Sequence, residues 1–487
     1  MKIAFLKHRT IWLSIAPILL LSGCTTPQAD IPKLDTTLSA SFYHLDTVDA
    51  QSDDIQWWAK FNDPVLTALI EKALNANHDI RIAMSRIKAA RAGLDAQDSR
   101  LWPTLNFQTS ASTAHSGLPA PYKQGLPDLR AYRAGIDIAW EIDVSGGIRA
   151  AANAAKSDAI AAESGAEGTR LLITSEIARQ YFILRGAEQR LDLLEELVKT
   201  YHESARLISR RFTEGQSSRF ELNLAKAEAG TLDAQLPLLE TLVAISQTHI
   251  ALLLGENPSV SPVSANPKYT WPQSRIIGTG QPSDLFRRRP DLMAAEAGYT
   301  AESLRSKEAE SQTWPKLFVN ALIGREDLRI NGLDLAPVPF SNVAMAFAIP
   351  IFNAGRIQAG IDAQSARENE ALLTWQKSVL VAVKEVEDTL SVRSQEQKRG
   401  ISLKAVVQNR NRALQEVELL YREGQIDKLA LLDVQRLLLD SEIVLMDHET
   451  QRLLADIQLY KALGGGWNPS QNELKAASED KYMKVLR

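Results

Sequence analysis

Much of the sequence occurs twice, and this duplication constrains the possible fold more than any other feature of the chain. Trp102-Pro103 recurs as Trp314-Pro315, 212 residues further along. Glu214-Gly215-Gln216 recurs as Glu423-Gly424-Gln425, 209 residues further along, so the two copies stay nearly in register. A period this long duplicates a whole structural half rather than a small solenoid unit. We therefore expect two halves that contain the same elements.

Each half contains one very long proline-free stretch. No proline occurs between Pro127 and Pro237, or between Pro350 and Pro469. Both stretches are rich in good helix formers, and their apolar residues recur at spacings of three and four, as in coiled coils. A helix from residue 147 to about 212 would be roughly 100 Å long at 1.5 Å per residue. Helices of this length are typical of extended assemblies rather than globular domains.

A glycine turn follows each long helix. Gly215 and Gly424 supply the left-handed residue that commonly ends a helix. Ser218 and Asp427 are placed to cap the helix that returns. Each half is therefore expected to close in a helical hairpin, at about 147–254 in the first copy and about 355–463 in the second.

Before each hairpin the hydrophobic period changes to two. Ile136, Ile138 and Trp140 alternate with acidic or small residues, and the second copy alternates similarly. This pattern is typical of a membrane β-barrel, although an ordinary half-buried sheet alternates in the same way. We expect strands within about 103–144 and 315–352. Four strands cannot close a barrel alone, so three chains giving twelve strands are the natural solution.

The first residues form an export signal. Lys2, Lys7 and Arg9 precede a short apolar stretch, 11–21, which is too short to span a bilayer. The stretch leads into Leu-Ser-Gly-Cys24, which resembles the bacterial lipobox, where the signal is cleaved before an acylated cysteine. Cys24 is the only cysteine in the chain. The resemblance predicts a covalent lipid there; the alternative is a chance buried or free cysteine.

These signals divide the whole chain into segments. The linker between the halves contains five prolines, and the last residues are polar and charged. The expected segments are a lipoprotein signal peptide at 1–23, a tether at 24–60, a first repeat at 61–255, a linker at 256–282, a second repeat at 283–466 and a tail at 467–487.

Composition argues against several classes of function. The net charge is −4, and no basic region with interleaved aromatic residues occurs, so nucleic acid is not an expected partner. The seven histidines are scattered, and no metal or nucleophile motif is recognisable, so neither a metal site nor an enzyme is expected. Outside the signal, no segment has a run of 18 or more apolar residues, which predicts no transmembrane helix in the mature chain. A membrane-spanning form would then have to be a β-barrel.

Four segments together resemble the outer-membrane efflux protein family, the TolC-like outer-membrane factors, and within it the lipoprotein branch similar to OprM and NodT. The resemblance covers nearly all of the mature chain. The segments that carry it are Trp57–Pro64, Leu285–Asp291, Ile351–Arg356 and Tyr421–Gly424.

This resemblance implies an α+β membrane protein with an internal tandem duplication. A homotrimer would form a twelve-stranded β-barrel, four strands per chain, continuous with a long α-helical coiled-coil barrel. It would lie in the cell outer membrane among its lipids, anchored through Cys24, and extend into the periplasm. Thr25, rather than Asp, follows the cysteine, which resembles an outer-membrane sorting pattern. The implied partners are a periplasmic adaptor and an inner-membrane pump of the resistance-nodulation-division (RND) type, with no cofactor beyond the lipid.

The resemblance also implies an aperture at the hairpin tips. In the family, carboxylates line the constriction and an Arg or Tyr on a neighbouring helix helps to close it. Alignment on Tyr421 places Asp433 at one of two acidic positions, and Ala430 departs from the other. Glu221 is the counterpart of Ala430 in the first copy. Asp433, Glu221 and Tyr421 are thus the aperture candidates, although Asp433 could equally be a solvated helix residue.

The turns at the tips are the expected contact with the adaptor, through Gly215, Gln216, Gly424 and Gln425. The expected function is a passive exit duct for small molecules in a tripartite efflux system. Two alternatives stay open. One is the duct of a type I protein secretion system, and the other is a lipoprotein scaffold of coiled coils without a channel.

Overall fold

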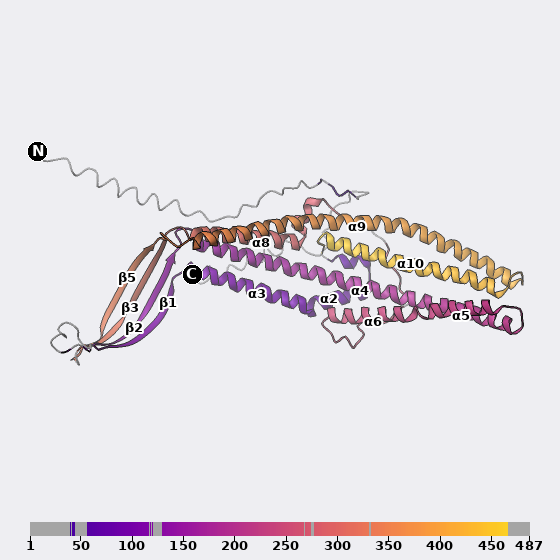
Figure 1. Ribbon diagram of the computed structural model, residues 1–487, viewed down its shortest axis with the longest axis horizontal. Coiled ribbons are helices and arrows are strands. Elements are labelled where there is room, and N and C mark those ends of the chain that lie inside the picture. Colours follow the sequence, from indigo (N-terminus) through magenta and orange to yellow (C-terminus); the bar gives the residue numbers. More distant parts are fainter. Residues whose placement is uncertain are drawn as a thin grey trace. The chain divides into compact units, whose positions relative to one another are not determined.

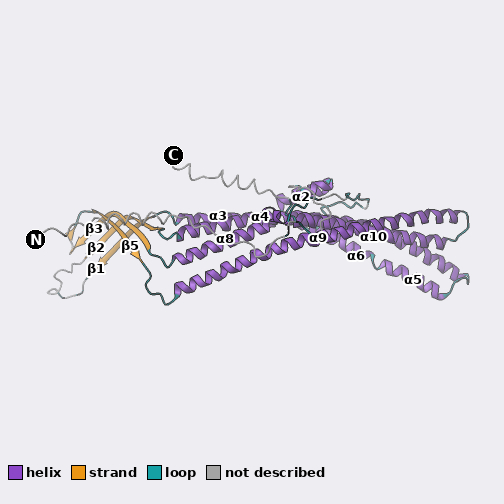
Figure 2. Cartoon of the chain, turned by 90° about the horizontal axis from the view of Figure 1, so that it is seen from above, coloured by secondary structure: helices purple, strands orange, loops and turns teal. Residues whose placement is uncertain are grey.

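The structure is a computed structural model that describes residues 39, 41–43, 56–115, 117, 119, 129–266, 268–273, 277–330 and 333–465. Cys24, the expected signal peptide and the expected tail lie outside these residues. The described chain combines long helices with one antiparallel sheet (Figure 1). Strands and helices occupy separate stretches of the fold (Figure 2), which makes the protein α+β, as expected from the sequence.

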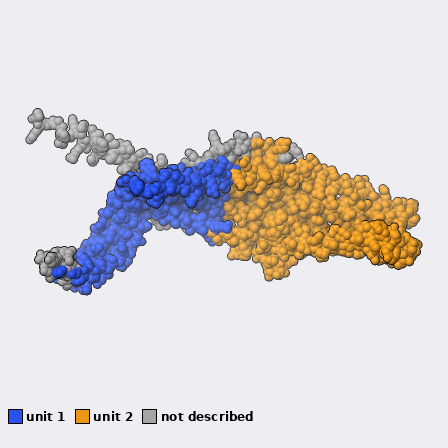
Figure 3. All heavy atoms as spheres, in the orientation of Figure 1, with its two compact units in different colours: residues 1–34, 86–163, 294–376 blue, residues 35–85, 164–293, 377–487 orange. Residues whose placement is uncertain are grey.

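The chain forms two compact units that do not coincide with the two sequence repeats (Figure 3). One unit contains Arg86–Glu163 and Ala294–Gln376, which hold the strands and the adjoining helix ends of both copies. The other contains Ser164–Met293 and the chain from Lys377, which hold both hairpins. Equivalent elements of the two copies therefore associate with each other rather than with the rest of their own copy.

The sheet takes two main strands from each copy. The strands are β1 (Thr104–Ala114), β2 (Leu129–Ile142), β3 (Lys316–Ile330), β4 (Leu333–Asp334) and β5 (Val338–Ala348). They pair in the order β1-β2-β3, with β4 and β5 both on β3, and every pairing is antiparallel. The copies join where β2 meets β3, with Ile136 opposite Ile323.

The register places most apolar residues of the four long strands on one face. Directly paired residues share a face, so Phe107 pairs with Ile136, Ile136 with Ile323, and Val319 with Met345 on the same side. This apolar face is exposed, with Phe107 at 76% and Met345 at 70% relative accessibility. The opposite face carries polar residues such as Asn106 and Asp137. A half-buried soluble sheet would cover its apolar face, so the exposure favours the membrane interpretation.

The helices follow the duplicated pattern. The two long helices, α4 (Gly147–Thr213) and α9 (Arg356–Arg422), are each 67 residues long. This corresponds to about 100 Å at 1.5 Å per residue. The remaining helices are the 3-10 helices η1 (Trp57–Phe61) and η3 (Pro282–Asp284), and α2 (Pro64–Ala76), α3 (His78–Ser99), α5 (Arg219–Asp233), α6 (Leu236–Leu253), α7 (Leu285–Arg288), α8 (Pro290–Ser311) and α10 (Lys428–Ala462).

The returning helix of the first hairpin is broken, which corrects the expectation of two equivalent returning helices. α5 ends at Asp233 and α6 begins at Leu236, whereas α10 runs unbroken for 35 residues. Pro237 explains the break, because it has no N–H to donate to the Asp233 carbonyl and its ring clashes with that carbonyl.

By length and mean hydropathy alone, one helical stretch among the described residues, Arg219–Leu253, could cross a membrane. The sequence had predicted no such helix. The stretch consists of α5 and α6, and its Leu232, Leu236 and Leu239 pack against buried residues of α4 and α10. Helices of a packed hairpin meet the same criterion of length and composition.

Trp57 of η1 and the linker are both anchored by specific contacts. Trp57 is fully buried and stacks on Tyr460 at 5.2 Å between ring centroids. Asp63 caps α2 by accepting from the N–H groups of Val65 and Leu66. Its other oxygen accepts from the hydroxyls of Tyr181 of α4 (2.8 Å) and Tyr269 of the linker (2.7 Å). The linker is therefore fastened to both the first hairpin and the start of α2.

Candidate functional site

The two hairpin tips share one turn geometry. Gly215 and Gly424 have φ of 73° and 74°, the left-handed conformation predicted from the sequence. Gln216 donates its backbone N–H to the carbonyl five residues earlier at 2.7 Å, and Gln425 does the same at 2.9 Å. This 6→1 bond closes a Schellman-type helix end. The duplicated Glu-Gly-Gln sequence thus folds into the same exposed turn twice.

At the first tip, Glu221 completes a capping box. Ser218 accepts from the Glu221 N–H, while the Glu221 carboxylate accepts from the Ser218 N–H at 2.7 Å and from the Ser217 hydroxyl at 2.6 Å. These hydrogen bonds to the charged form lower the pKa of Glu221. Glu221, predicted as an aperture residue, is therefore engaged within its own turn. The Ser-x-x-Glu spacing carried this signal in the sequence.

At the second tip, Asp427 serves two partners. One carboxylate oxygen accepts from the Ala430 N–H at 2.9 Å and caps α10. The other accepts from the Arg211 guanidinium at 2.9 Å, and Arg211 lies in the last turn of α4. The pKa of Asp427 is lowered, most by the hydrogen bond from the Ala430 N–H and next by that from Arg211. The cap of the second hairpin is thus also a bridge to the first.

Asp433, the predicted constriction residue, is an exposed side chain of α10 paired with Arg436 one turn further along. Arg436 also stacks over the ring of Tyr201 of α4 at 4.4 Å and lies 3.9 Å from Glu228 of α5. Asp433 is therefore tied, through Arg436, to the first hairpin. Sequence reasoning overlooked Arg436 and Tyr201 because their contact joins distant segments.

Tyr421, the third aperture candidate, lies in the last turn of α9 beside Lys428 of α10. The Lys428 ammonium lies 5.6 Å from the centre of the Tyr421 ring and 3.9 Å from Glu203 of α4. The structure thus places Tyr421 and Asp433 each beside a cation of α10 that also reaches α4. The hydrogen bonds of Glu221 lie within its own turn, and among the described residues none of them reaches Asp433.

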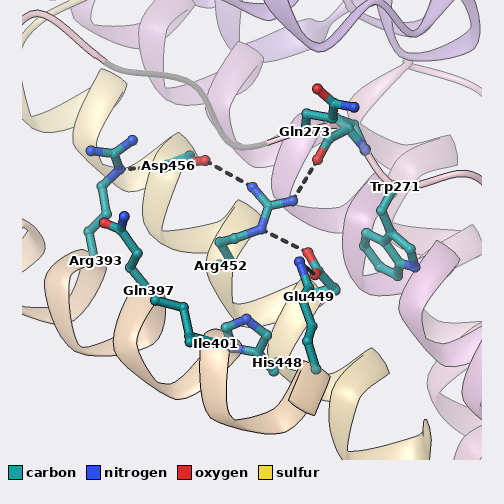
Figure 4. A pocket seen from close by; sticks show the side chains of 12 residues that line it. Trp271, Gln273, Arg393, Gln397, Ile401, His448, Glu449, Arg452 and Asp456 are labelled. Carbon is teal, nitrogen blue, oxygen red and sulfur yellow. Dashed lines mark hydrogen bonds and ion pairs between the residues drawn. The ribbon is translucent and has the colours of Figure 1, made fainter. Parts of the chain in front are cut away.

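Further along the second hairpin, a cavity of about 450 Å³ lies between α9, α10 and the linker (Figure 4). Arg452 of α10 lies at its centre. Its guanidinium donates to Glu449 at 2.8 Å and to the Pro272 carbonyl of the linker at 2.6 Å, and it lies 3.5 Å from Asp456. Arg393 of α9 also binds Asp456, at 2.7 Å. This ion network joins the linker to both helices of the second hairpin.

The network's two carboxylates differ in their electrostatics. Burial raises the pKa of Asp456 despite its two arginine neighbours. Burial would also raise the pKa of Glu449, but hydrogen bonds from Lys404 and Arg452 outweigh it and lower the pKa. Among the described residues, the cavity lining contains no hydroxyl or thiol nucleophile. No group of three or more metal-ligating side chains occurs among the described residues.

Comparison with known proteins gives a consistent match over both repeats. Residues 69–256 and 282–465 match the family model described as outer membrane efflux protein. The solvent efflux pump outer membrane protein SrpC of Pseudomonas putida is 29% identical over 420 residues, covering 85% of this chain and 87% of SrpC. The probable outer membrane lipoprotein SilC of Salmonella typhimurium is 25% identical, covering 93% of this chain and 98% of SilC.

A solved structure matches the whole described architecture. The outer-membrane channel OprN is 27% identical and superposes with a TM-score of 0.81, covering 91% of this chain and all of the OprN chain. The similarity therefore extends over strands, long helices and hairpins together.

Proposed function

We propose that this chain, which belongs to the outer membrane efflux protein family, is the exit duct of a tripartite efflux system. The protein is an outer-membrane efflux channel. What we propose beyond this is its assembly, its partners and its cargo. Three chains would form one duct, fed by a periplasmic adaptor and an inner-membrane RND-type pump, and the cargo would be small molecules. The similarity to a solvent efflux protein supports that cargo class.

The exposed apolar face of the sheet is the observation that carries this proposal. It runs over all four long strands, while β1 and β5 each leave one long edge without a partner strand among the described residues. Unpaired backbone is not tolerated in lipid, so these edges must pair with further strands. Three protomers supply twelve strands and close a barrel wide enough to conduct. A coiled-coil scaffold has no need of such a sheet.

The hairpins form the periplasmic part of the proposed duct. Three protomers supply six hairpins, and Asp433 and Glu221 would recur as rings near the tips. Rings of carboxylates favour cations and repel anions in a narrow pore. Because Glu221 also holds its own capping box, we assign the stronger aperture role to Asp433, with Tyr421 beside it. The exposed turns at Gly215 and Gly424 are the proposed contact with the adaptor.

The proposed anchor is an acylated Cys24, which lies outside the described residues. The similarity to a probable outer membrane lipoprotein supports it. Each buried methylene contributes about 0.8 kcal/mol, so several acyl chains hold a protein firmly.

Single-channel recording in planar bilayers tests the duct. The purified chain should have the mass of three protomers in detergent and should conduct, with a preference for cations. Asp433→Ala should reduce that preference, and Arg436→Met should raise the open probability. A trimer that stays silent even with both changes contradicts the channel. Conductance from a monomer or dimer contradicts the twelve-stranded assembly alone.

A further inference from the structure

The apolar face of the sheet carries an arginine cluster at the end of its apolar band. Arg130 of β2 lies directly opposite Arg329 of β3, and Arg325 lies on the same face opposite Ala134. All three arginines are exposed. Like charges that face each other across two strands destabilise the pairing unless something neutralises them. We call Arg130, Arg325 and Arg329 the outer arginine cluster.

Among the described residues, few anions neutralise this cluster. Asp334 pairs with Arg329, and Asp327 lies between Arg325 and Arg329 on the same face. Neither Arg130 nor Arg325 has an ion-pair partner among the described residues. The cluster thus retains an excess of positive charge, with guanidinium donors to spare.

The position of the cluster matches the level of lipid headgroups. From Ile142 to Tyr132 the apolar face spans ten residues, about 33 Å along the strand at 3.3 Å per residue, or about 25 Å along the membrane normal at a tilt near 40°. This equals the height of the apolar band of outer-membrane barrels. Tyr132, 52% exposed, then lies at the interface, where tyrosine is enriched. Arg130 and Arg329 lie just beyond it. Arg325, opposite Ala134, lies two residues short of it, where a long arginine side chain can extend to the same level.

The cluster also lies at the outer-leaflet end of the sheet and within one chain. Leu129 begins β2 and Ile330 ends β3 at the end of the strands remote from α4 and α8. In an outer-membrane duct whose helices enter the periplasm, that end faces the cell exterior. β2 and β3 are the two central strands of the chain, so in the proposed trimer no joint between protomers covers the cluster.

We propose that the outer arginine cluster binds the phosphate groups of an outer-leaflet lipid. Arginine forms bidentate, charge-assisted hydrogen bonds with phosphate, and an anion between Arg130 and Arg329 removes their repulsion. The inference rests on the proposed function, because it requires the apolar face to contact lipid. Two sources share this chemistry: a diphosphorylated lipid A and an ordinary anionic phospholipid.

Native mass spectrometry of the purified full chain tests the site. The wild type, titrated with diphosphorylated lipid A, should retain lipid that the triple variant Arg130→Gln, Arg325→Gln, Arg329→Gln binds at least about tenfold more weakly. Arg133→Gln is the matched control, because Arg133 is on the same strand but the opposite face, where it pairs with Glu326 at 2.6 Å. The control should bind like the wild type.

Further arms identify the source and exclude trivial results. Phosphatidylglycerol and monophosphorylated lipid A replace lipid A in parallel titrations; arginine-dependent binding of any of them supports the site, and their order names the lipid. Equal lipid retention by wild type and triple variant, or an equal loss in Arg133→Gln, overturns the proposal. Arg130→Gln alone, expected to weaken binding several-fold, serves if the triple variant does not assemble. Conductance measured on the same samples reports the duct separately, since the triple variant should still conduct.

Discussion

The two hairpins come from one duplicated sequence, yet their tips are held in different ways. At the first tip, Ser218 and Glu221 satisfy each other's backbone within a single turn. At the second, Asp427 caps α10 and also binds Arg211 of the first hairpin. The duplication therefore supplies a common turn, while the stability of the second tip depends on its neighbour. This difference indicates that α10 is the helix whose movement would break contacts between hairpins.

The returning helices differ in the same direction. α10 is continuous and buries Leu439 against Leu194 and Leu197 of α4, whereas the first copy has Gly230 at the position 209 residues earlier. The first returning helix is also interrupted at Ala234 and Gln235. α10 thus contacts α4 through both apolar and charged side chains.

The largest expected effect comes from removing the apolar contact between α10 and α4. Leu439→Ala removes buried methyl groups and should destabilise α10 by about 2–5 kcal/mol. Hydrogen exchange of the α10 amides measures it. Gly230→Ala is the matched control: a Cβ there meets nothing within 4 Å, so it should stabilise α5 by about 0.5–1 kcal/mol. Slower exchange in Leu439→Ala as well as in Gly230→Ala would contradict the stabilisation of α10 by the packing of Leu439.

Arg436→Met should have the next largest effect. It keeps an apolar side chain over the Tyr201 ring but removes the cation–π interaction and the pairing with Asp433 and Glu228. A contribution of about 1–2 kcal/mol corresponds to a roughly 5–30-fold rise in open probability. Single-channel recording measures it. Arg410→Met, which removes another arginine of the same hairpin, should change it much less; equal effects would show that Arg436 has no special role.

Removing either N-cap should cost a smaller, similar amount locally. Ser218→Ala and Asp427→Ala each remove a cap that is typically worth about 1 kcal/mol. The difference lies in the spread of the effect. Ser218→Ala should speed hydrogen exchange only in the first turns of α5, while Asp427→Ala should also speed it at the end of α4, where Arg211 loses its partner. Identical patterns for the two variants would remove the distinction between the tips.

The smallest expected effect isolates the Arg211 bridge. Asp427→Asn keeps a good cap but removes the charge, and an exposed pair contributes about 0.2–1 kcal/mol. Its effect on exchange should vanish at 1 M salt, where the Debye length is about 3 Å.

The same pair predicts a pH dependence. Since the pKa of Asp427 is lowered in the folded state, its stabilisation is present above the ordinary value near 3.9 and is lost as the pH falls below about 4. Exchange at the start of α10 should therefore increase under acid in the wild type and not in Asp427→Asn. A matching acid response in the variant would assign it to another group.

Most of the fold could be predicted because its signals are local. The change of period at Pro103, the proline-free stretches, the positive-φ glycines and the caps at Ser218 and Asp427 all act within a few residues. The break between α5 and α6 was missed although Pro237 marked it, because the duplication suggested a helix like α10. The candidate acids were found by spacing, but what they contact was not.

By itself, the sequence determined the elements: which stretches are strands, how long the helices are, and where the chain turns back. Only the tertiary structure decided the partners. The pairing of β2 with β3, which creates the continuous apolar face and sets Arg130 against Arg329, joins residues of different copies. The bridge from Arg211 to Asp427 spans 216 residues. Periodicity and capping are encoded over a few neighbouring residues, whereas these contacts exist only after the two copies have been brought side by side.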